Sequence, residues 1–317
     1  MNRVVQLSAG AASLRLLPHA GGRVSALRLV RPRGSALDVL HPYPEDFFDP
    51  IHWAKGGIYP LMPYSNRIAN ARVLVNGETV ALLPHPDAAP HSLHGNAHAL
   101  AWQLESCAQA SASMTLDAQS SPAWPWRYRG RIDIALTPSE LSMRIEIRNV
   151  DARSIPAGVG LHPYFRHRSD ARLGYRASAF WPTTPEFLPL TPRAPLVDEM
   201  HAPARPLPEG GLTRYVSGWD GRLNLDLPGA SPSIPQGERV QVHDSRLYRL
   251  HIQADPVFDH LVVHRPDNLA YLCIEPVSHV ADGFNLSARG VEGTGARMLA
   301  PGESLAGTVR FSLEDLR

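Results

Sequence analysis

The sequence contains very little lysine and cysteine and almost no net charge. Lys55 is the only lysine in 317 residues, so a catalytic lysine Schiff base would have to form there. Cys107 and Cys273 are too few for a disulfide scaffold. The 31 basic and 30 acidic residues give a net charge of +1, and no long run of either sign occurs. Nucleic acids and anionic membranes require a concentrated basic patch, so neither is expected as a partner.

Long hydrophobic runs and cofactor-binding sequences are also missing. No segment approaches the length of a transmembrane helix. Residues 1–9 are interrupted by polar side chains and lack the apolar core of a signal peptide. The chain contains no GxGxxG, Walker, GxSxG or CxxC sequence. We therefore expect a soluble, cytoplasmic protein without a cofactor.

What the sequence has in quantity is the periodicity of β-strands. Thirty prolines and 24 glycines interrupt most windows before a helical period develops. Apolar and polar residues alternate in 132–136 and 141–147, on either side of a turn at 137–140, which predicts an antiparallel hairpin with one solvated face. Asn76–Gly77 predicts a tight turn between two further strands. Other alternating segments lie at 14–16, 24–29, 112–116, 223–227, 248–252, 261–263 and 309–313. The pattern predicts an all-β fold, with residues 1–317 forming one large antiparallel sandwich domain.

The strand that ends at Glu275 carries the first candidate for chemistry. Apolar side chains occupy both faces of Tyr271–Glu275, and Pro276 stops the strand's hydrogen-bond ladder directly afterwards. A carboxylate buried there requires a partner or a task, and burial would raise its pKa towards that of a useful base. The alternative is an ordinary strand-end glutamate satisfied by backbone groups.

Two other stretches offer polar groups in apolar surroundings. His162 follows the small-residue stretch Gly158–Leu161 and precedes Pro163, which suits a rigidly held general acid. His41 starts the same His-Pro-Tyr tripeptide but lacks the apolar strand before it. Asn66 and Arg67 form a polar pair between a proline-rich turn and apolar residues, and arginine suits hydroxyl pairs or carboxylates. A buried structural histidine and a loop-bridging arginine are the alternatives.

The histidine-rich run His85–His98 suggests a metal site, since His91, His94 and His98 have ligand-like spacing. However, Pro86, Pro90 and Gly95 disfavour a helix that would bring the three imidazoles to one face. We therefore expect no metal there, and instead expect His94 to project from a tight turn with Gly95.

Trp219 and Asp220 lie between glycines, an arrangement that suits sugar binding. An aromatic ring can cover C–H surface while a carboxylate accepts from hydroxyl groups. A plain type I turn is the alternative. Together, the buried glutamate, the two histidines, the arginine and the aspartate fit acid–base chemistry on a neutral polyol.

Six segments in this order resemble the aldose 1-epimerase (galactose mutarotase) family. They are Asn66–Ile68, Ser92–Gly95, Leu161–Phe165, Gly218–Gly221, Cys273–Pro276 and Leu299–Glu303. The resemblance implies an antiparallel β-supersandwich of the galactose mutarotase type, no metal, and interconversion of the α and β anomers of a hexose. It implies that Glu275 takes the proton of the anomeric hydroxyl and that His162 donates to the ring oxygen. His94, Asn66, Arg67 and Asp220 would hold the sugar's hydroxyls.

The chain departs from the family pattern at two places. Asn96 replaces the usual second glycine of a His-Gly-Gly sequence, and His260 stands roughly where a glutamine is expected. Two alternatives to a hexose mutarotase therefore remain open. One is an epimerase for a phosphorylated or otherwise anionic sugar, for which arginine would be a bidentate partner. The other is a non-catalytic carbohydrate-binding sandwich, which would not need a matched acid and base.

The expected mechanism sets the pH dependence. A carboxylate base and an imidazole acid on opposite sides of one sugar predict a bell-shaped catalytic efficiency. Burial would raise the pKa of Glu275 and lower that of His162, while the charge of Glu275 opposes the lowering. The two macroscopic values are therefore expected to belong partly to the pair.

Overall fold

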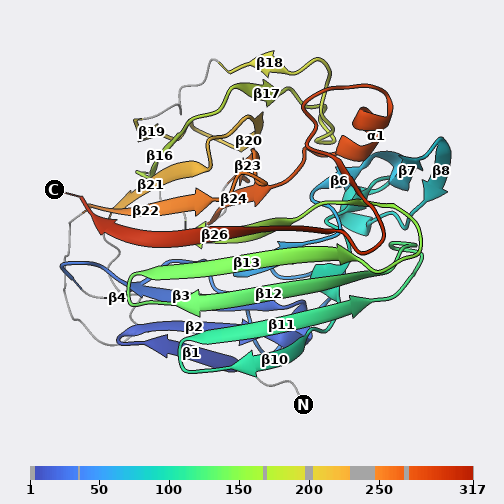
Figure 1. Ribbon diagram of the computed structural model, residues 1–317. Coiled ribbons are helices and arrows are strands. Elements are labelled where there is room, and N and C mark those ends of the chain that lie inside the picture. Colours follow the sequence, from blue (N-terminus) through green and yellow to red (C-terminus); the bar gives the residue numbers. More distant parts are fainter. Residues whose placement is uncertain are drawn as a thin grey trace.

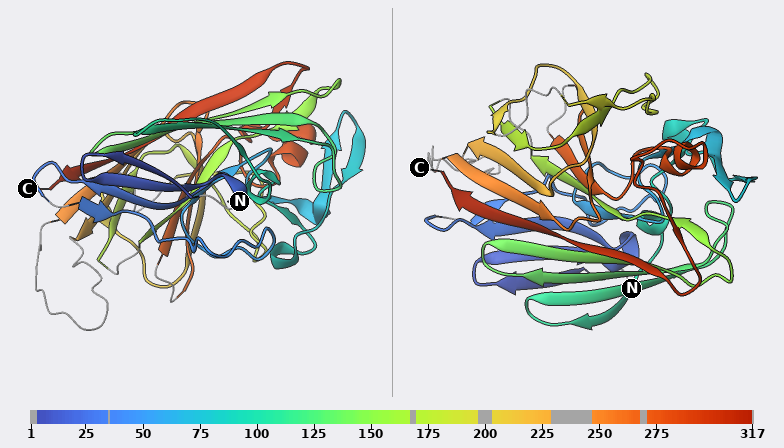
Figure 2. Two further views of the ribbon diagram at one scale, coloured as in Figure 1. Left: turned by 90° about the horizontal axis from the view of Figure 1, so that it is seen from below. Right: turned by 45° about the horizontal axis from the view of Figure 1, so that its top comes forward.

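The computed structural model describes residues 4–34, 36–166, 170–196, 203–228, 247–267 and 271–316. Within these residues most regular structure is antiparallel β-strand, arranged in two large sheets that face each other (Figures 1 and 2). Seen from below, the long green and red strands form one layer and the blue N-terminal strands lie in the other (Figure 2). The predicted all-β supersandwich is confirmed.

The first sheet contains the strands that carry His162 and Glu275. Its hydrogen-bonded order is β1 (Val5–Ala9), β2 (Ala12–Leu17), β3 (Arg23–Val30), β5 (Ile58–Leu61), β15 (Gly160–Arg166), β24 (Tyr271–Val277), β23 (His260–Arg265), β20 (Leu212–Ser217), β17 (Ala179–Trp181) and β18 (Ala194–Pro195). Strand β4 (Ala36–Asp38) pairs with β3 off this path. Strands from the start, middle and end of the chain thus meet at its centre.

The second sheet is built from the longest strands. Its order is β10 (Gln103–Cys107), β11 (Ser111–Ala118), β12 (Tyr128–Leu136), β13 (Glu140–Asn149), β26 (Ser304–Asp315), β22 (Leu247–Ala254), β21 (Arg222–Pro228), β16 (Arg172–Tyr175) and β19 (Arg205–Pro206). The hairpin predicted around residues 137–140 is β12–β13, with Leu136 opposite Leu141. Its alternate side chains are buried and solvated, as the sequence pattern requires.

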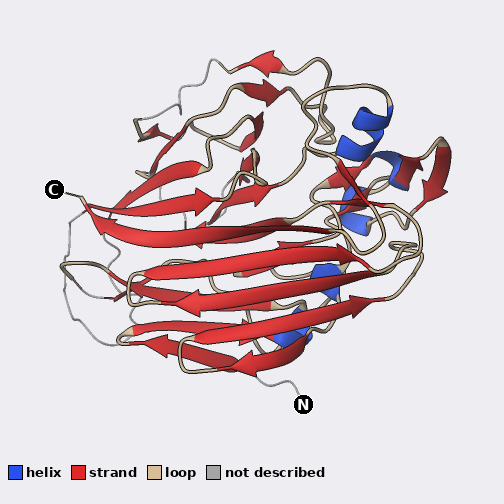
Figure 3. Ribbon diagram, viewed as in Figure 1, coloured by secondary structure: helices blue, strands red, loops and turns tan. Residues whose placement is uncertain are grey.

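Small elements complete the molecule. Three two-stranded sheets pair β6 (Arg67–Ile68) with β9 (Ser92–Leu93), β7 (Arg72–Val75) with β8 (Glu78–Ala81), and β14 (Ile155–Ala157) with β25 (Arg297–Leu299). The Asn76–Gly77 turn joins β7 to β8, and both residues have positive φ as this turn type needs. The helices are short: η1 (Pro18–Ala20), η2 (Ala69–Ala71), η3 (Pro86–Ala88), η4 (Ala97–Ala99) and α1 (Gly283–Ala288), all towards the right of Figure 3. None of the helices in the described part of the chain combines the length and apolarity needed to cross a membrane.

One face of the first sheet packs into the core between the two sheets, and the other face forms a separate cluster of buried side chains. Leu161, Leu272 and Ile274 belong to the large core between the sheets, where Phe165 meets Phe311 of β26 with ring centroids 6.0 Å apart. Their sequence neighbours on β15 and β24 point to the opposite face and join a separate cluster with Tyr59, Tyr164 and Cys273. This period of two explains why both faces of the Glu275 strand look apolar in the sequence.

Candidate active site

Strand register aligns one row of side chains across the first sheet. Tyr59 of β5 pairs with His162 of β15, and Val262 of β23 pairs with Glu275 of β24. Gly160 pairs with Val277 and Tyr164 with Cys273, so His162 and Glu275 face each other across the β15–β24 ladder. Residues from four strands and three distant parts of the sequence therefore lie side by side on one face.

This row lies against a cavity of about 190 Å³. Five of the six predicted site residues line it: Asn66, Arg67, His94, His162 and Glu275. The other lining residues are Trp53, Lys55, Tyr59, Asp87, Leu93, Tyr164, Phe187, Thr213, Tyr215, Val262, His264, Tyr271 and Cys273. A mixed aromatic and polar lining of this kind is typical of a small-ligand site.

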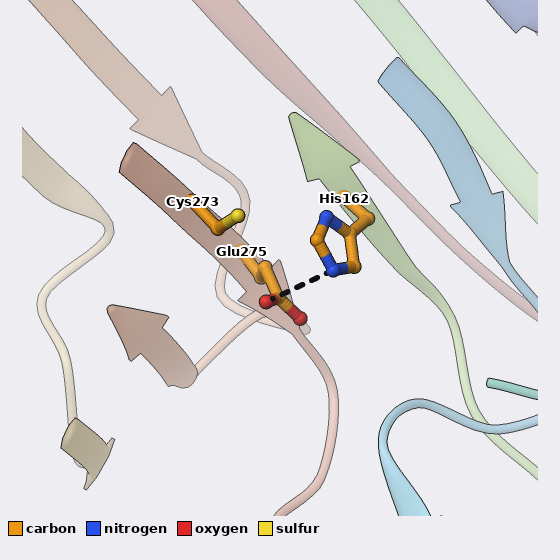
Figure 4. Close-up of side chains that lie close together, drawn as sticks. All are labelled: His162, Cys273 and Glu275. Carbon is orange, nitrogen blue, oxygen red and sulfur yellow. Dashed lines mark ion pairs between the residues drawn. The ribbon is translucent and has the colours of Figure 1, made fainter. Parts of the chain in front are cut away.

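His162 and Glu275, which both line the cavity, form a buried pair on adjacent strands (Figure 4). The Nε2 atom of His162 lies 3.2 Å from Oε1 of Glu275, and the side chains are 7% and 3% exposed. The Nδ1 atom of His162 and the Oε2 atom of Glu275 have no hydrogen-bond partner among the described residues. The sequence predicted an acid and a base on opposite sides of a sugar; instead they lie next to each other on adjacent strands.

Burial moves the pKa values of this pair in opposite directions. It raises the pKa of the Glu275 carboxyl to about 8, while the nearby charge of Arg67 acts the other way. Burial also lowers the pKa of His162 well below the ordinary value of 6.5, helped by the neighbouring His264, Lys55 and Arg23. Both predicted directions are confirmed. Because the carboxyl now holds a proton more tightly than the imidazole, the pair shares one proton at neutral pH.

Asn66 organises the polar side of the cavity. Its Oδ1 accepts hydrogen bonds from the Arg67 backbone N–H at 2.9 Å, the Arg67 guanidinium at 3.3 Å and the Tyr215 hydroxyl at 3.2 Å. The guanidinium also lies 4.8 Å from the centre of the Phe187 ring. These contacts hold Arg67 in one orientation at the cavity, which a binding arginine requires.

His94 is oriented by the backbone of Asn66. The Asn66 N–H donates to Nδ1 of His94 at 3.1 Å, so the remaining proton of the neutral ring is on Nε2, which is left as a donor. Burial lowers the pKa of His94 well below its usual value, so the ring stays neutral. His94 and Gly95 both have positive φ, and a Cβ at Gly95 would come within 2.2 Å of the Met62 carbonyl oxygen. The predicted tight turn is confirmed, and Gly95 is required for it.

The prediction for Asp220 needs correction. Asp220 is exposed in the turn between β20 and β21, where its Oδ1 accepts from the backbone N–H of Arg222 at 3.0 Å. It does not line the cavity, and Trp219 is buried with its indole N–H donating to the Arg222 carbonyl. Because Asp220 is exposed and lies outside the lining, it is unsuited to hold a ligand in this cavity.

Two histidines considered in the sequence analysis, His260 and His41, do not line the cavity. His260 is buried between Asp259 and the Gly293 carbonyl, 2.6 and 3.0 Å from its ring nitrogens. The histidine of β23 that reaches the cavity is His264, four residues later, where Thr213 contacts its Nδ1 at 2.9 Å. His41 is also absent from the lining. Alternation along β23 from Val262, opposite Glu275, would have identified His264 once the register was known.

Asn96, which replaces the usual second glycine of the family's His-Gly-Gly sequence, fits the backbone at its position. Its φ is −124°, so no glycine is required, and its Oδ1 accepts from the Tyr128 hydroxyl at 2.7 Å.

The potential metal ligands that lie close together in space are not those of the histidine-rich run His85–His98. Within the described residues, His162, Cys273 and Glu275 form the only such group, with ligand atoms within 4.8 Å of one another. His91 and His94 instead use Nδ1 to accept from the backbone N–H groups of Asn70 and Asn66. Cys273 is 1% exposed and lines the cavity together with Glu275.

Comparisons with known proteins agree with the observed fold. The family model for aldose 1-epimerase matches residues 3–312. The uncharacterised protein YphB of Escherichia coli K12 is 26% identical over 258 residues, covering 81% of this chain and 83% of that protein. A galactose mutarotase-like protein of Clostridium acetobutylicum has the same fold, with a TM-score of 0.77 at 16% identity, covering 99% of this chain and 95% of that one.

A galactose 1-epimerase of Lactobacillus acidophilus also shares the fold, with a TM-score of 0.73 at 15% identity and coverage of 99% and 95%. Identities this low establish the fold alone, whereas the family model spans nearly the whole chain. The chain belongs to the aldose 1-epimerase family.

Proposed function

We propose that this protein is an aldose 1-epimerase that interconverts the α and β anomers of a hexose by opening and reclosing the sugar ring. The observation that carries the proposal is the buried contact of 3.2 Å between His162 Nε2 and Glu275 Oε1 in the cavity. The anomeric hydroxyl oxygen and the ring oxygen are both bonded to C1. Two groups that act on them must therefore lie close together, as this pair does.

The chemistry needs one proton shared between the two side chains. The reaction starts when the shared proton passes from Glu275 to His162 across their contact, which leaves a carboxylate and an imidazolium. The Glu275 carboxylate then takes the proton of the O1 hydroxyl, C1 and O1 form a carbonyl, the bond from C1 to the ring oxygen O5 breaks, and His162 gives its proton to O5. After rotation about C1–C2, His162 takes the O5 proton, O5 attacks the other face of C1, and Glu275 returns a proton to O1. Each group alternates between acid and base, and the pair ends with the proton it started with.

The remaining cavity groups are suited to positioning. Neutral His94 offers Nε2–H as a donor, and Arg67 offers a forked donor fixed by Asn66. Held in this way, the sugar meets the acid–base pair without the entropy loss of a free encounter. Polarimetry tests the proposal: the protein should accelerate the rotation change of freshly dissolved α-glucose or α-galactose. Failure with every hexose offered would contradict it.

An anionic sugar is the second candidate, because Lys55 and Arg67 both line the cavity. Lys55, the only lysine, has its Nζ atom 4.5 Å above the Trp53 ring. Asp87 also lines the cavity and offsets part of this positive charge, which favours a neutral hexose. A hexose 6-phosphate included in the same polarimetry separates the candidates. A higher kcat/KM for the phosphate, lost in Lys55→Met, would favour the anionic sugar.

A plot of kcat/KM against pH should be bell-shaped, with both limbs set by the titration of the His162–Glu275 pair. Below the lowered pKa of His162 the pair takes up a second proton and has no base, so the acid limb should lie below the ordinary histidine value of 6.5. Near pH 8 the pair loses its last proton and has no acid, because burial raises the pKa of Glu275 to about 8. The profile of kcat/KM between pH 4 and 10, corrected for uncatalysed mutarotation, measures both limbs. A rate that keeps rising above pH 9 would contradict this order.

Activity should survive removal of metal ions. Acid and base come from side chains, and the Nδ1 atoms of His91 and His94 already accept hydrogen bonds from backbone N–H groups, so they are not free to bind an ion. Treatment with a chelator followed by polarimetry is the measurement, with elemental analysis expected to find less than one ion per chain. A zinc ion whose removal abolishes turnover would instead point to a metal mechanism at His162, Cys273 and Glu275.

A further inference from the structure

The most unusual charged group outside the acid–base pair is Arg23. It lies at the start of β3 with 0% of its surface exposed. None of its three side-chain nitrogens has a hydrogen-bond partner among the described residues. A buried charge without such a partner is unfavourable for folding, and it calls for a functional explanation.

Among the described residues, the groups that contact the Arg23 guanidinium are aromatic rings and not a carboxylate. The guanidinium carbon lies 4.4 Å from the centre of the Tyr43 ring and 4.5 Å from that of Tyr59. Arginine between two ring faces is stabilised by cation–π attraction, which is strongest when water is excluded. Rings contribute no negative charge, so the positive charge of Arg23 remains uncompensated.

The stack continues from Arg23 to the candidate acid. The ring centre of Tyr59 lies 4.7 Å from that of His162, with an interplanar angle of 24°. The ring of Tyr164 covers His162 on β15 at 4.6 Å and 18°. Strand register explains the order, since Val24 pairs with Ile58 and Tyr59 pairs with His162. Arg23 thus extends the row of cavity residues by one strand, behind Tyr59.

Several other groups face His162, and their charges must be weighed. Glu275 and Cys273 of β24 and the phenols of Tyr59 and Tyr164 are the acidic ones. His94, His98 and His264 have pKa values lowered by burial and are neutral near pH 7. The permanent cations are therefore Arg23, Lys55 and Arg67. Lys55 is exposed and Arg67 half-buried, so water screens both, whereas Arg23 acts through a dry stack.

We propose that Arg23 is a positioning residue, whose buried charge acts through Tyr59 on His162 and keeps the His162–Glu275 pair at one shared proton. This rests on the proposed function, in which a second proton on the pair would remove the base. Arg23 also holds the Tyr59 ring against which the imidazole plane is set. Burial is the main cause of the lowered pKa of His162, and the charges of His264, Lys55 and Arg23 lower it further.

Arg23→Met tests the proposal, because methionine fills similar space without charge. The acid limb of kcat/KM should move to higher pH by on the order of one unit, since two ring spacings of low-dielectric protein separate the charge from the imidazole. An NMR titration of the His162 ring without sugar should show a rise of the same size. Arg23→Lys keeps the charge and should restore most of the wild-type midpoint.

Two further variants make the outcome decisive. Tyr43→Leu leaves the guanidinium but opens its outer face to water, so a smaller shift in the same direction is expected; it decides the matter if Arg23→Met does not fold. Arg265→Met removes another buried arginine, which donates to the Pro208 and Gly210 carbonyls, and should leave the His162 midpoint unchanged. Unmoved midpoints in folded Arg23→Met and Tyr43→Leu, or an equal shift in Arg265→Met, would overturn the proposal. The NMR titration needs no turnover, so it holds or fails independently of the epimerase activity.

Discussion

Replacement of Glu275 by glutamine is expected to lower kcat/KM for mutarotation by at least about a hundredfold, the scale of general base catalysis. Glutamine keeps the shape of the side chain and can still contact His162, but it cannot accept the proton of O1. Polarimetry with a fresh α-hexose, at saturating and at low concentrations, would separate the loss in kcat from any change in KM.

The same substitution should leave the melting temperature at pH 7 unchanged or raise it. The folded-state pKa of Glu275 is about 8, against an ordinary value of 4.5. The folded chain therefore retains a proton that the unfolded chain releases across this window, and Glu275 destabilises the fold increasingly as pH rises from 4.5 to 8. At pH 7 this amounts to on the order of 3 kcal/mol, which a neutral amide would avoid.

Glu146→Gln is the matched control. Glu146 lies on β13 of the second sheet, where it accepts from Arg144 at 2.8 Å near the surface. Its replacement should change neither rate nor melting temperature appreciably. A folded Glu275→Gln variant that keeps most of its activity would make Glu275 structural and favour the carbohydrate-binding alternative.

Replacement of His162 by asparagine is expected to lower kcat/KM by roughly a hundred- to ten-thousandfold and to remove the alkaline limb of the pH profile. Without the imidazole the site has no acid whose proton can be lost. The residual rate should then only rise as Glu275 ionises. The measurement is a full pH profile of the variant, because a rate at one pH would not separate lost chemistry from a damaged fold.

His41→Asn controls for the shared His-Pro-Tyr tripeptide. His41 lies outside the cavity, and its ring contacts Tyr271 with centroids 5.8 Å apart. We expect both limbs of the bell to survive this change. The assignment would be reversed if His41→Asn abolished activity while His162→Asn retained it.

Local patterns were sufficient for many of the longer strands and for the chemistry of single residues. Alternation in 132–147 predicted β12 and β13, and Asn76–Gly77 predicted the turn between β7 and β8, because both depend on neighbouring residues only. The position of Glu275 at the end of a strand apolar on both faces predicted its burial and the raised pKa. Asp220 was predicted wrongly because a Trp-Asp-Gly turn has the same local sequence whether it faces a cavity or solvent.

Strand period, turn chemistry and burial are local properties, and for that reason they predicted a β-rich chain with a buried glutamate, a rigidly held histidine and a polar Asn-Arg pair. Only the tertiary structure decided that His162 and Glu275 are 3.2 Å apart, that His264 rather than His260 reaches the cavity, and that Arg23 stacks behind Tyr59. These relations depend on the register of β3, β5, β15, β24 and β23, which are far apart in the chain. A shift of one residue in any of these pairings would turn a whole strand's side chains to the other face, and no local pattern specifies which strands become neighbours.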